Sequence, residues 1–375
     1  MNTLWGFIRS FAIIAGIVGA IYITWSIYRF PGIRKITKNK RIPGLLLSFG
    51  IFAAFFALFY FTMSLVNCVI ILIHLLLFKL IFDLVGVFIK KARKEKHPEG
   101  TRSGFYWQGW GAFGLCFIYL AIGYFLCNHV FVTTYDLETD KAVGDLKIVM
   151  FADSHIGATF DGDGFKEQID RINAENPDLV LLVGDFVDDG TDKENMLKAC
   201  EALSTVKATY GLWYVYGNHD KGYYGANRRG YSPSTLEYNL LLSKVHVLED
   251  KVREIGDNIV IVGRADASNH GRMSIETLTK NIDPDKYVIV LDHQPTDYEN
   301  EANSVADLVL SGHTHGGQML PFTFFRQSFG GNNSVYGHEK RNNTDFIVTS
   351  GIADWELKFK TGTKSEYVVI NVKGK

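Results

Sequence analysis

Residues 312 to 318 read Gly-His-Thr-His-Gly-Gly-Gln, and they follow directly on the apolar run from Ala306 to Ser311. Such a run is typical of a buried strand, so His313 and His315 leave the end of a strand together. The flanking glycines let the backbone turn tightly and approach whatever the imidazoles hold. Two half-buried histidines with satisfied hydrogen bonds would look the same, so this stretch alone leaves metal binding open.

The same pattern recurs upstream, where four more apolar runs each end in Asp, Asn or His. The runs and their polar ends are Leu146 to Phe151 with Asp153 and His155, Leu179 to Val183 with Asp185, Leu212 to Tyr216 with Asn218, His219 and Asp220, and Tyr287 to Leu291 with Asp292 and His293. Open α/β sheets bind ligands at the carboxyl ends of their strands. These side chains are therefore expected to converge in space.

In their order these motifs resemble the calcineurin-like metallophosphoesterases. Asp-x-His, Gly-Asp-x-x-Asp, Gly-Asn-His-Asp, a single His and Gly-His-x-His follow one another between Leu146 and Val372, with Gly184 to Asp188 supplying the second. The Gly-Gly-Gln after His315 is similar to the membrane-tethered or exported bacterial branch of that family. The resemblance implies a two-sheet α/β sandwich flanked by helices on both outer faces.

The resemblance also implies two metal ions and a set of ligands for each. The first metal would be held by Asp153, His155, Asp185 and His315, and the second by Asp185, Asn218, His293 and His313. Asp185 would bridge the two. His219 would stay off the metals as the acid that protonates the leaving oxygen, and Asp220 would orient it.

The chemistry of the proposed ligands narrows the choice of metal. The set offers nitrogen and oxygen atoms but no thiolate, which suits Mn, Fe or Zn, with Co or Ni also compatible, and disfavours Ca or Mg alone. Two such ions lower the pKa of a bridging water, so no protein nucleophile is needed. Asp188, Asp189 and Asp192 follow the second motif and are either partners of metal-bound imidazoles or residues of a solvated loop.

The N-terminal part of the chain has a different composition. It holds 14 Lys and Arg against 3 Asp and Glu up to Val132, whereas the remainder holds 25 against 37. Long apolar stretches of about 20 residues cross a bilayer as helices. Four are present, at residues 11–28, 43–63, 67–88 and 107–131. We therefore expect a transmembrane domain over residues 1–132, a polar linker over 133–145 and the phosphoesterase domain over 146–375.

Charged loops predict how the chain crosses the bilayer. The two basic loops, Arg34 to Arg41 and Lys90 to Arg102, are short and lie beside span ends, where positive charge marks the cytoplasmic side. An integral cell-membrane protein with an extracytoplasmic catalytic domain follows. Lys79 and Asp83 stand four residues apart within the third span and favour a structural ion pair.

Two stretches are candidates for binding the substrate. Arg228 and Arg229 follow Asp220 in a glycine-bearing loop and could clamp a phosphate. An aromatic lip follows His315 and consists of Phe322, Phe324, Phe325 and Arg326. The lip favours a lipid-linked phosphate, and the alternatives are a phosphodiesterase or phosphatase for soluble nucleotides or sugar phosphates, or a membrane receptor or scaffold. Nucleic acid is not expected as a partner, because the acidic half offers no basic track for phosphates.

Overall fold

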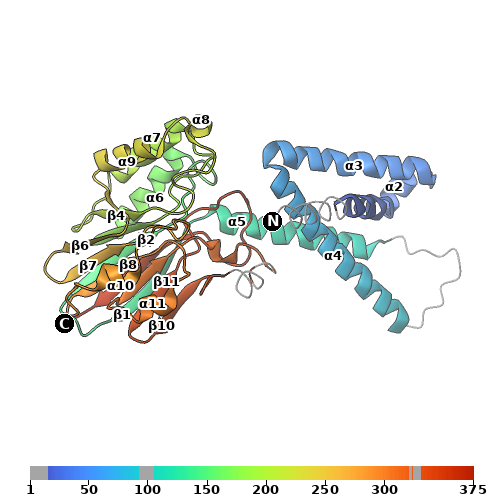
Figure 1. The fold of residues 1–375 in the computed structure, drawn as a ribbon. Helices are drawn as coiled ribbons and strands as arrows, with labels where there is room; N and C mark the ends of the chain where they lie inside the picture. The colour runs from blue at the N-terminus through green and yellow to red at the C-terminus, as the bar shows by residue number, and fades with distance from the viewer. Residues whose placement is uncertain (1–15, 93–104, 321–322, 324–330) are drawn as a thin grey trace. The chain divides into compact units, whose positions relative to one another are not determined.

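The computed structural model describes residues 16–92, 105–320, 323 and 331–375. The chain divides into two compact units, Met1–Ile122 and Gly123–Lys375 (Figure 1). The boundary falls inside a helix and not at the predicted end of the transmembrane domain near residue 132. The last turn of that helix therefore belongs to the second unit.

Apolar helices make up the described part of the first unit. They are Gly16–Tyr28, α2 (Pro31–Ile36), α3 (Arg41–Thr62), α4 (Leu65–Ala92) and α5 (Trp107–Asn128). Three of them, α3, α4 and α5, are long and apolar enough to span a membrane, and they correspond to the second, third and fourth predicted spans. The first predicted span lies partly outside the described residues, and its described part is too short to count as a span.

Polar side chains gather inside this helical unit. Lys79 is fully buried and pairs with Asp83 one turn later on α4, as the sequence predicts. Asp83 also accepts a hydrogen bond from Tyr22 and lies 3.4 Å from Arg29. The carboxylate is thus compensated from two helices, as a charged group away from water requires.

The strands of the second unit form two sheets of six within the described residues. The first has the order β1, β12, β2, β3, β4, β5, and the second β10, β11, β9, β8, β7, β6. The bounds are β1 Phe131–Glu138, β2 Asp145–Phe151, β3 Leu179–Val183, β4 Leu212–Val215, β5 His246–Leu248, β6 Lys251–Ile255, β7 Ile259–Gly263, β8 Tyr287–Leu291, β9 Leu308–Ser311, β10 Gly337–Arg341, β11 Thr344–Val348 and β12 Glu366–Lys373.

Three apolar clusters hold the layers together. One lies between the two sheets and includes Ile148, Ile289 and Ile370. A second joins the first sheet to α6, α7 and α9, and a third joins the second sheet to α10 and α11 (Figure 1). The helices are α6 Gly162–Ala174, α7 Lys193–Leu203, α8 Ala226–Arg229, α9 Pro233–Leu242, α10 Ile275–Thr279 and α11 Tyr298–Ala302. The expected sandwich of two sheets between outer helices is confirmed.

Helix α6 shows how local sequence sets these elements. Asp161 caps it by accepting a hydrogen bond of 2.9 Å from the Gly164 amide, which satisfies one of the free donors of the first turn. Phe165, Ile169 and Ile172 share one face and are fully buried. The apolar runs predicted as strands agree with the observed strands to within two residues.

The first part of the predicted linker over residues 133–145 is a strand in the structure. Residues 131–138 form strand β1, which pairs in parallel with β12 from Phe131 opposite Glu366 to Glu138 opposite Lys373. The acidic composition hid a period-two pattern in which Phe131, Thr133, Tyr135 and Leu137 turn toward the protein. Such alternation is typical of a half-buried strand, so the catalytic unit begins before this stretch.

Candidate metal centre

The strand ends bring the predicted metal ligands together in two groups. Asp153, His155 and His315 form one group, and Asp185, His293 and His313 form the other, with ligand atoms in each group within 4.8 Å of one another. Strands β2, β3 and β4 are parallel in the first sheet and β8 and β9 are parallel in the second. Their carboxyl ends therefore deliver all six residues to one edge of the sandwich.

Three imidazoles present the Nε2 atom to the carboxylates. The Nε2 atoms of His155 and His293 lie 3.7 and 3.1 Å from Asp185 Oδ2, and His315 Nε2 lies 3.8 Å from Asp153 Oδ1. Burial opposes ionisation of Asp185, but the neighbouring histidines, His293 first, hold its pKa well below the ordinary value. The carboxylate is therefore charged and placed among imidazole lone pairs.

The opposite ring nitrogen of each of these imidazoles faces an oxygen. His293 Nδ1 lies 2.8 Å from the Val183 carbonyl, His155 Nδ1 lies 3.4 Å from Asp188 Oδ2, and His315 Nδ1 lies 3.1 Å from Asp354 Oδ1. An oxygen behind Nδ1 fixes the orientation of the ring and leaves the Nε2 lone pair for a metal. For Asp188, the structure favours the role of partner to an imidazole over that of a residue in a solvated loop.

Unpartnered buried atoms show that the site suits a divalent cation. The Nε2 atoms of His155 and His293 and the Oδ1 atom of Asn218 are buried without a hydrogen-bond partner. Asn218 donates through Nδ2 to the Tyr223 hydroxyl at 2.8 Å, which leaves Oδ1 as an acceptor. Buried lone pairs cost stability unless something binds them. Nitrogen and oxygen donors of this kind fit the transition metals expected from the sequence.

Backbone strain concentrates at the same residues. Asp153, His155, Asp185, His313 and His315 all have positive φ, between 36° and 70°, which side-chain-bearing residues seldom adopt. Gly184 packs so closely that a Cβ atom there would lie 2.4 Å from His293 Nδ1. Strain of this kind persists only where the surroundings enforce it, and it clusters at functional sites.

Asp220 has a different position from the one expected. Its carboxylate accepts backbone hydrogen bonds from Asp185, Val187 and Gly217 at 2.9, 3.0 and 2.6 Å, and the described contacts include none with the His219 ring. Burial and the nearby Asp185 charge raise the pKa of Asp220 to about 6. It therefore holds the loops that carry the candidate ligands, and its predicted role of orienting His219 stays a prediction.

His219 borders an open cavity of about 720 Å³. Its ring lies 5.1 Å from the rings of His155 and Trp355 and 5.2 Å from that of Tyr223. Its backbone amide donates to Asp185 Oδ1 at 2.9 Å, and burial lowers the pKa of the imidazole. A titratable side chain thus stands between the candidate ligands and a space that can hold a substrate.

The two predicted arginines have different environments. Arg228 lines the cavity, and its guanidinium lies 4.7 Å from the Tyr224 ring centre. Arg229 is 3% exposed and donates to the Asp220 carbonyl at 2.8 Å, so it has a structural partner here, and its predicted role in binding substrate stays a prediction. The other predicted substrate residues, Phe322, Phe324, Phe325 and Arg326, lie outside the described residues.

The three aspartates that follow the second motif have three different roles. Asp188 backs His155, whereas Asp189 accepts hydrogen bonds from the amides of Tyr223 and Tyr224 at 2.9 and 3.2 Å. Asp192 caps α7 through the Asn195 amide at 2.8 Å. Asp189 thereby fixes the aromatic loop that borders the cavity.

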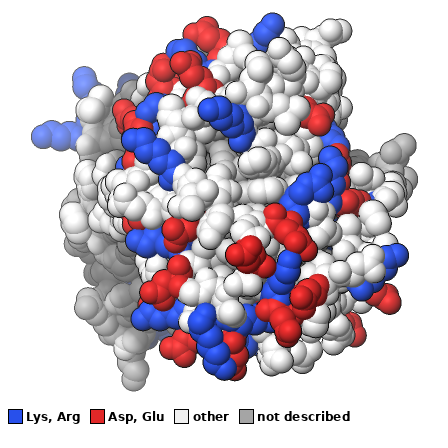
Figure 2. Space-filling view, turned by 90° about the vertical axis from the view of Figure 1, so that its left-hand side faces the viewer, with Lys and Arg blue, Asp and Glu red and all other residues white. Residues whose placement is uncertain are grey.

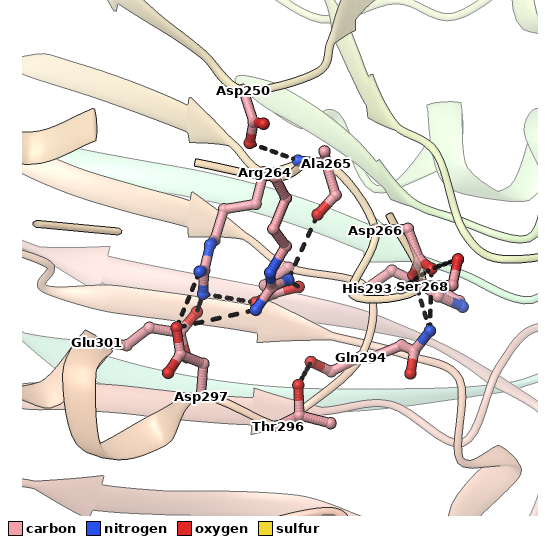
Figure 3. A network of polar contacts seen from close by, with 12 residues as sticks. Asp250, Arg264, Ala265, Asp266, Ser268, His293, Gln294, Thr296, Asp297 and Glu301 are labelled. Carbon is pink, nitrogen blue, oxygen red and sulfur yellow. Dashed lines mark hydrogen bonds and ion pairs between the residues drawn. The ribbon is translucent and has the colours of Figure 1, made fainter. Parts of the chain in front are cut away.

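A buried ion-pair network supports the loop after β8, which carries His293 (Figure 3). Arg264 lies 2.8 Å from Asp292 and from Asp297 and 3.0 Å from Glu301. On the other side of His293, Gln294 donates to both oxygens of Asp266 at 3.0 Å. Polar groups on both sides of His293 therefore fix its backbone, as a precisely placed ligand requires.

The sequence reasoning missed two residues of the site, Asp354 and Trp355. Both follow β11 in a stretch without any of the expected motifs, yet Asp354 backs His315 and Trp355 packs on His219. Trp355 is 51% exposed, which is unusual for so large an aromatic side chain. A Trp beside an Asp after the last parallel strand was the only available signal.

Comparison with known proteins places the chain in a family. Residues 146–317 match the model of the calcineurin-like phosphoesterases. A metallophosphoesterase of Campylobacter jejuni is 31% identical over 65% of this chain and 63% of its own length, and one of Aquifex aeolicus is 30% identical over 65% of this chain and 92% of its own.

A relative with a membrane part is also similar. A Danio rerio protein described as a transmembrane protein with metallophosphoesterase domain is 28% identical over 62% of this chain and 54% of its own length. This chain spans 63% of the Campylobacter relative and about half of the zebrafish one. Together with the match to the family model and the Aquifex relative, these findings show that the chain belongs to the calcineurin-like metallophosphoesterases, a family of metal-dependent phosphoric ester hydrolases.

Proposed function

We propose that the protein is a membrane-anchored, dinuclear metal-dependent hydrolase of a phosphoester or pyrophosphate bond. The observation that supports this best is the pair of adjacent ligand groups, which place unpartnered buried nitrogen atoms of His155 and His293 around the charged Asp185. A cavity bordered by His219 opens beside them. Both a place for metals and a place for a substrate are therefore present.

Each residue has a defined task in this proposal. One metal would be held by Asp153, His155, Asp185 and His315, and the other by Asp185, Asn218, His293 and His313. Bound divalent ions supply hydroxide from water near neutral pH and neutralise charge on a phosphoryl group. His219 holds a proton at a ring nitrogen beside the cavity and gives it to the leaving oxygen.

The lining of the cavity favours an amphiphilic substrate. Tyr223, Tyr224 and Trp355 are 59%, 70% and 51% exposed and border the cavity with Arg228 and three acidic residues, so a ligand there would meet aromatic rings and one cation beside carboxyl groups. A phosphate with a lipid-linked leaving group offers both partners, and burying methylenes contributes about 0.8 kcal/mol each. The alternative is a soluble nucleotide or sugar phosphate that stacks on the same rings.

The surface charge fits a small substrate better than a nucleic acid. Figure 2 shows a face on which Lys and Arg alternate with Asp and Glu, without a continuous basic band. Binding along a nucleic-acid backbone depends on such a band. Three apolar helices of spanning length are consistent with a substrate at a bilayer.

A substrate screen tests the proposal directly. The full chain in detergent would be stripped of metal, reconstituted with Mn, Fe or Zn, and assayed on phosphomonoesters, phosphodiesters, nucleotides and lipid phosphates. We expect metal-dependent turnover, with about two metal ions per chain and the highest catalytic efficiency on a lipid phosphate. Turnover of soluble esters alone would reject the amphiphile, and metal-bound protein without turnover of any ester would reject the enzyme.

The charged loops lead us to propose an extracytoplasmic catalytic unit. A Ser334→Cys variant should react with an impermeant thiol reagent added to intact cells, whereas a Ser103→Cys variant should not. Both would be made in a chain whose four cysteines, all buried within the described residues, are replaced. The reverse labelling pattern would place the catalytic unit in the cytoplasm.

A further inference from the structure

Asp354 lies behind His315, on the side of the imidazole away from the candidate metal site. Its Oδ1 atom is 3.1 Å from His315 Nδ1, whereas His315 Nε2 faces Asp153. Asp354 is 1% exposed, so it has no access to substrate. A carboxylate in this position fixes the tautomer and the direction of the ring and makes the other nitrogen a better ligand.

The other oxygen of Asp354 is held by the end of the membrane helix. Cys127, in the last turn of α5, donates from Sγ to Asp354 Oδ2 at 3.0 Å. Cys127 is fully buried, and its Sγ atom is the donor, so the contact is a hydrogen bond from a thiol to a carboxylate.

The same helix end is anchored to the segment that surrounds Asp354. Three carbonyls near the end of α5 accept hydrogen bonds from the segment after Asp354: Gly123 from the Lys360 amide at 2.9 Å, Leu126 from the Ser365 amide at 2.9 Å, and Cys127 from the Ser365 hydroxyl at 2.7 Å. Helix termini need such partners when they are buried. The turn is thus fixed to the catalytic unit by three hydrogen bonds as well as by Cys127.

Lys360 supplies the charge that the buried carboxylate needs. Its Nζ atom lies 3.5 Å from Asp354 Oδ1 and donates to the Ser350 carbonyl at 2.7 Å. The Asp354 carboxylate therefore lies between the Lys360 ammonium group, the His315 ring and the Cys127 thiol.

We propose that Asp354 is a positioning residue for His315 and that the last turn of α5 holds it in place through Cys127. The inference rests on the proposed metal site. It makes the end of a membrane helix part of the support of one metal, so that the helix does more than anchor the enzyme. The affected ion is the one held by Asp153, His155 and His315; the site built on His293 has its own support.

The test is a metal titration of the full chain in detergent, followed by calorimetry and by metal analysis. We expect wild-type protein to bind two ions, and Asp354→Asn to bind one of them about 10- to 100-fold more weakly with the other unchanged. Cys127→Ala should weaken binding of the same ion to a smaller extent. Cys127→Ser, which keeps a hydrogen-bond donor, should restore the wild-type affinity. Selective loss of one ion is not what general destabilisation produces.

Matched controls separate positioning from folding. Asp345 also pairs with one histidine and one lysine, His338 at 2.8 Å and Lys340 at 3.1 Å, but His338 belongs to neither ligand group. Asp345→Asn and Cys116→Ala, which alters another buried cysteine of α5, should leave both ions bound as in wild type. The double variant Asp354→Asn with Lys360→Met removes the buried charge pair together, so it serves if Asp354→Asn alone does not fold.

The outcomes are distinct from those that test the function. Wild-type protein that binds no metal would reject the proposed function and the inference with it. Wild-type protein with two ions, combined with unchanged affinities in Asp354→Asn and in the double variant, would overturn only the positioning role. An equal loss of affinity for both ions would also overturn the positioning role, because His315 belongs to one ligand group.

Discussion

The two units of the chain place their apolar side chains in opposite ways. On α3, α4 and α5 the apolar side chains face outward, with Phe61, Ile42 and Phe117 between 73% and 83% exposed, while Lys79 and His74 are buried. In the second unit the apolar side chains fill the interior between and outside the sheets. Outward apolar side chains over whole helices mean that the surrounding solvent is lipid.

Both units bury charged side chains, but the buried charges have different roles. In the first, Lys79 and Asp83 neutralise each other on one helix face. In the second, the imidazoles around Asp185 keep buried nitrogen atoms without hydrogen-bond partners. The difference indicates that buried charge in the helical unit stabilises a fold, whereas in the catalytic unit it surrounds the candidate metal ligands. The following experiments test that contrast, beginning with the largest expected effect.

Replacing Asp185 should abolish function. Asp185→Asn keeps the size of the side chain but removes the charge that two histidines face, and a neutral amide is a weak ligand for both metals. We expect turnover to fall by at least about a thousandfold, together with the metal content. Asp345→Asn, which changes a carboxylate that faces His338 outside both candidate ligand groups, is the matched control. Full metal content and activity in Asp185→Asn would remove the basis for the assignment.

Replacing His219 should lower the rate but leave the metals. The ring lies among His155, Trp355 and Tyr223 beside the cavity, so His219→Ala should cost about 10²- to 10⁴-fold in kcat on substrates with poor leaving groups. The loss should be much smaller for nitrophenyl esters, whose leaving anion needs no proton. Equal losses on both kinds of ester would assign His219 to positioning.

The sequence predicted the residues that belong to a recurring pattern at strand ends, and it missed a residue that lies outside that pattern. Five strand ends with polar residues could be recognised because each has the same apolar run before it, and the residues of both candidate ligand groups follow such runs. Asp354 supports His315 but follows no such run, so only the folded chain brings it there. Local patterns therefore locate ligands, while the residues that hold them depend on tertiary packing.

The differences from the predictions have the same origin. Residues 131–138 are polar enough to suggest a linker, yet β12 lies beside them and turns their weak alternation into a strand. Asp220 ends a motif and Arg229 follows it in a glycine-bearing loop, and both are buried and bonded to backbone groups. Burial depends on neighbours that are distant in sequence, which a motif does not describe.

Breaking the ion pair of the helical unit should cost stability without cost to catalysis. Lys79→Met leaves Asp83 with Tyr22 and Arg29 as partners, so we expect a loss of about 1–3 kcal/mol in the free energy of unfolding. The double variant with Asp83→Asn should recover most of it. Metal content and the catalytic rate of the remaining folded protein should match wild type, as thermal unfolding and activity assays in detergent would show. A specific loss of turnover would instead give this pair a part in function.

The smallest effect is expected at Glu301, where the catalytic unit buries charge for structure as the helical unit does. Asp292, Asp297 and Glu301 face Arg264 and Arg272, so three carboxyl groups meet two cations. Burial and the Asp292 charge raise the pKa of Glu301 well above its ordinary 4.5, which indicates that Glu301 carries the balancing proton.

The sign of the pH dependence follows from this shift. A raised pKa means that the folded state binds the proton more tightly than the unfolded state, so this group's contribution to stability is lost as the pH rises above about 4.5 toward the folded-state pKa. Glu301→Gln mimics the protonated acid and should change stability by less than about 1 kcal/mol at low pH. Urea unfolding across that range should show a flatter dependence in the variant than in wild type. A large loss at every pH would mean that Glu301 is ionised and that Arg264 needs its charge.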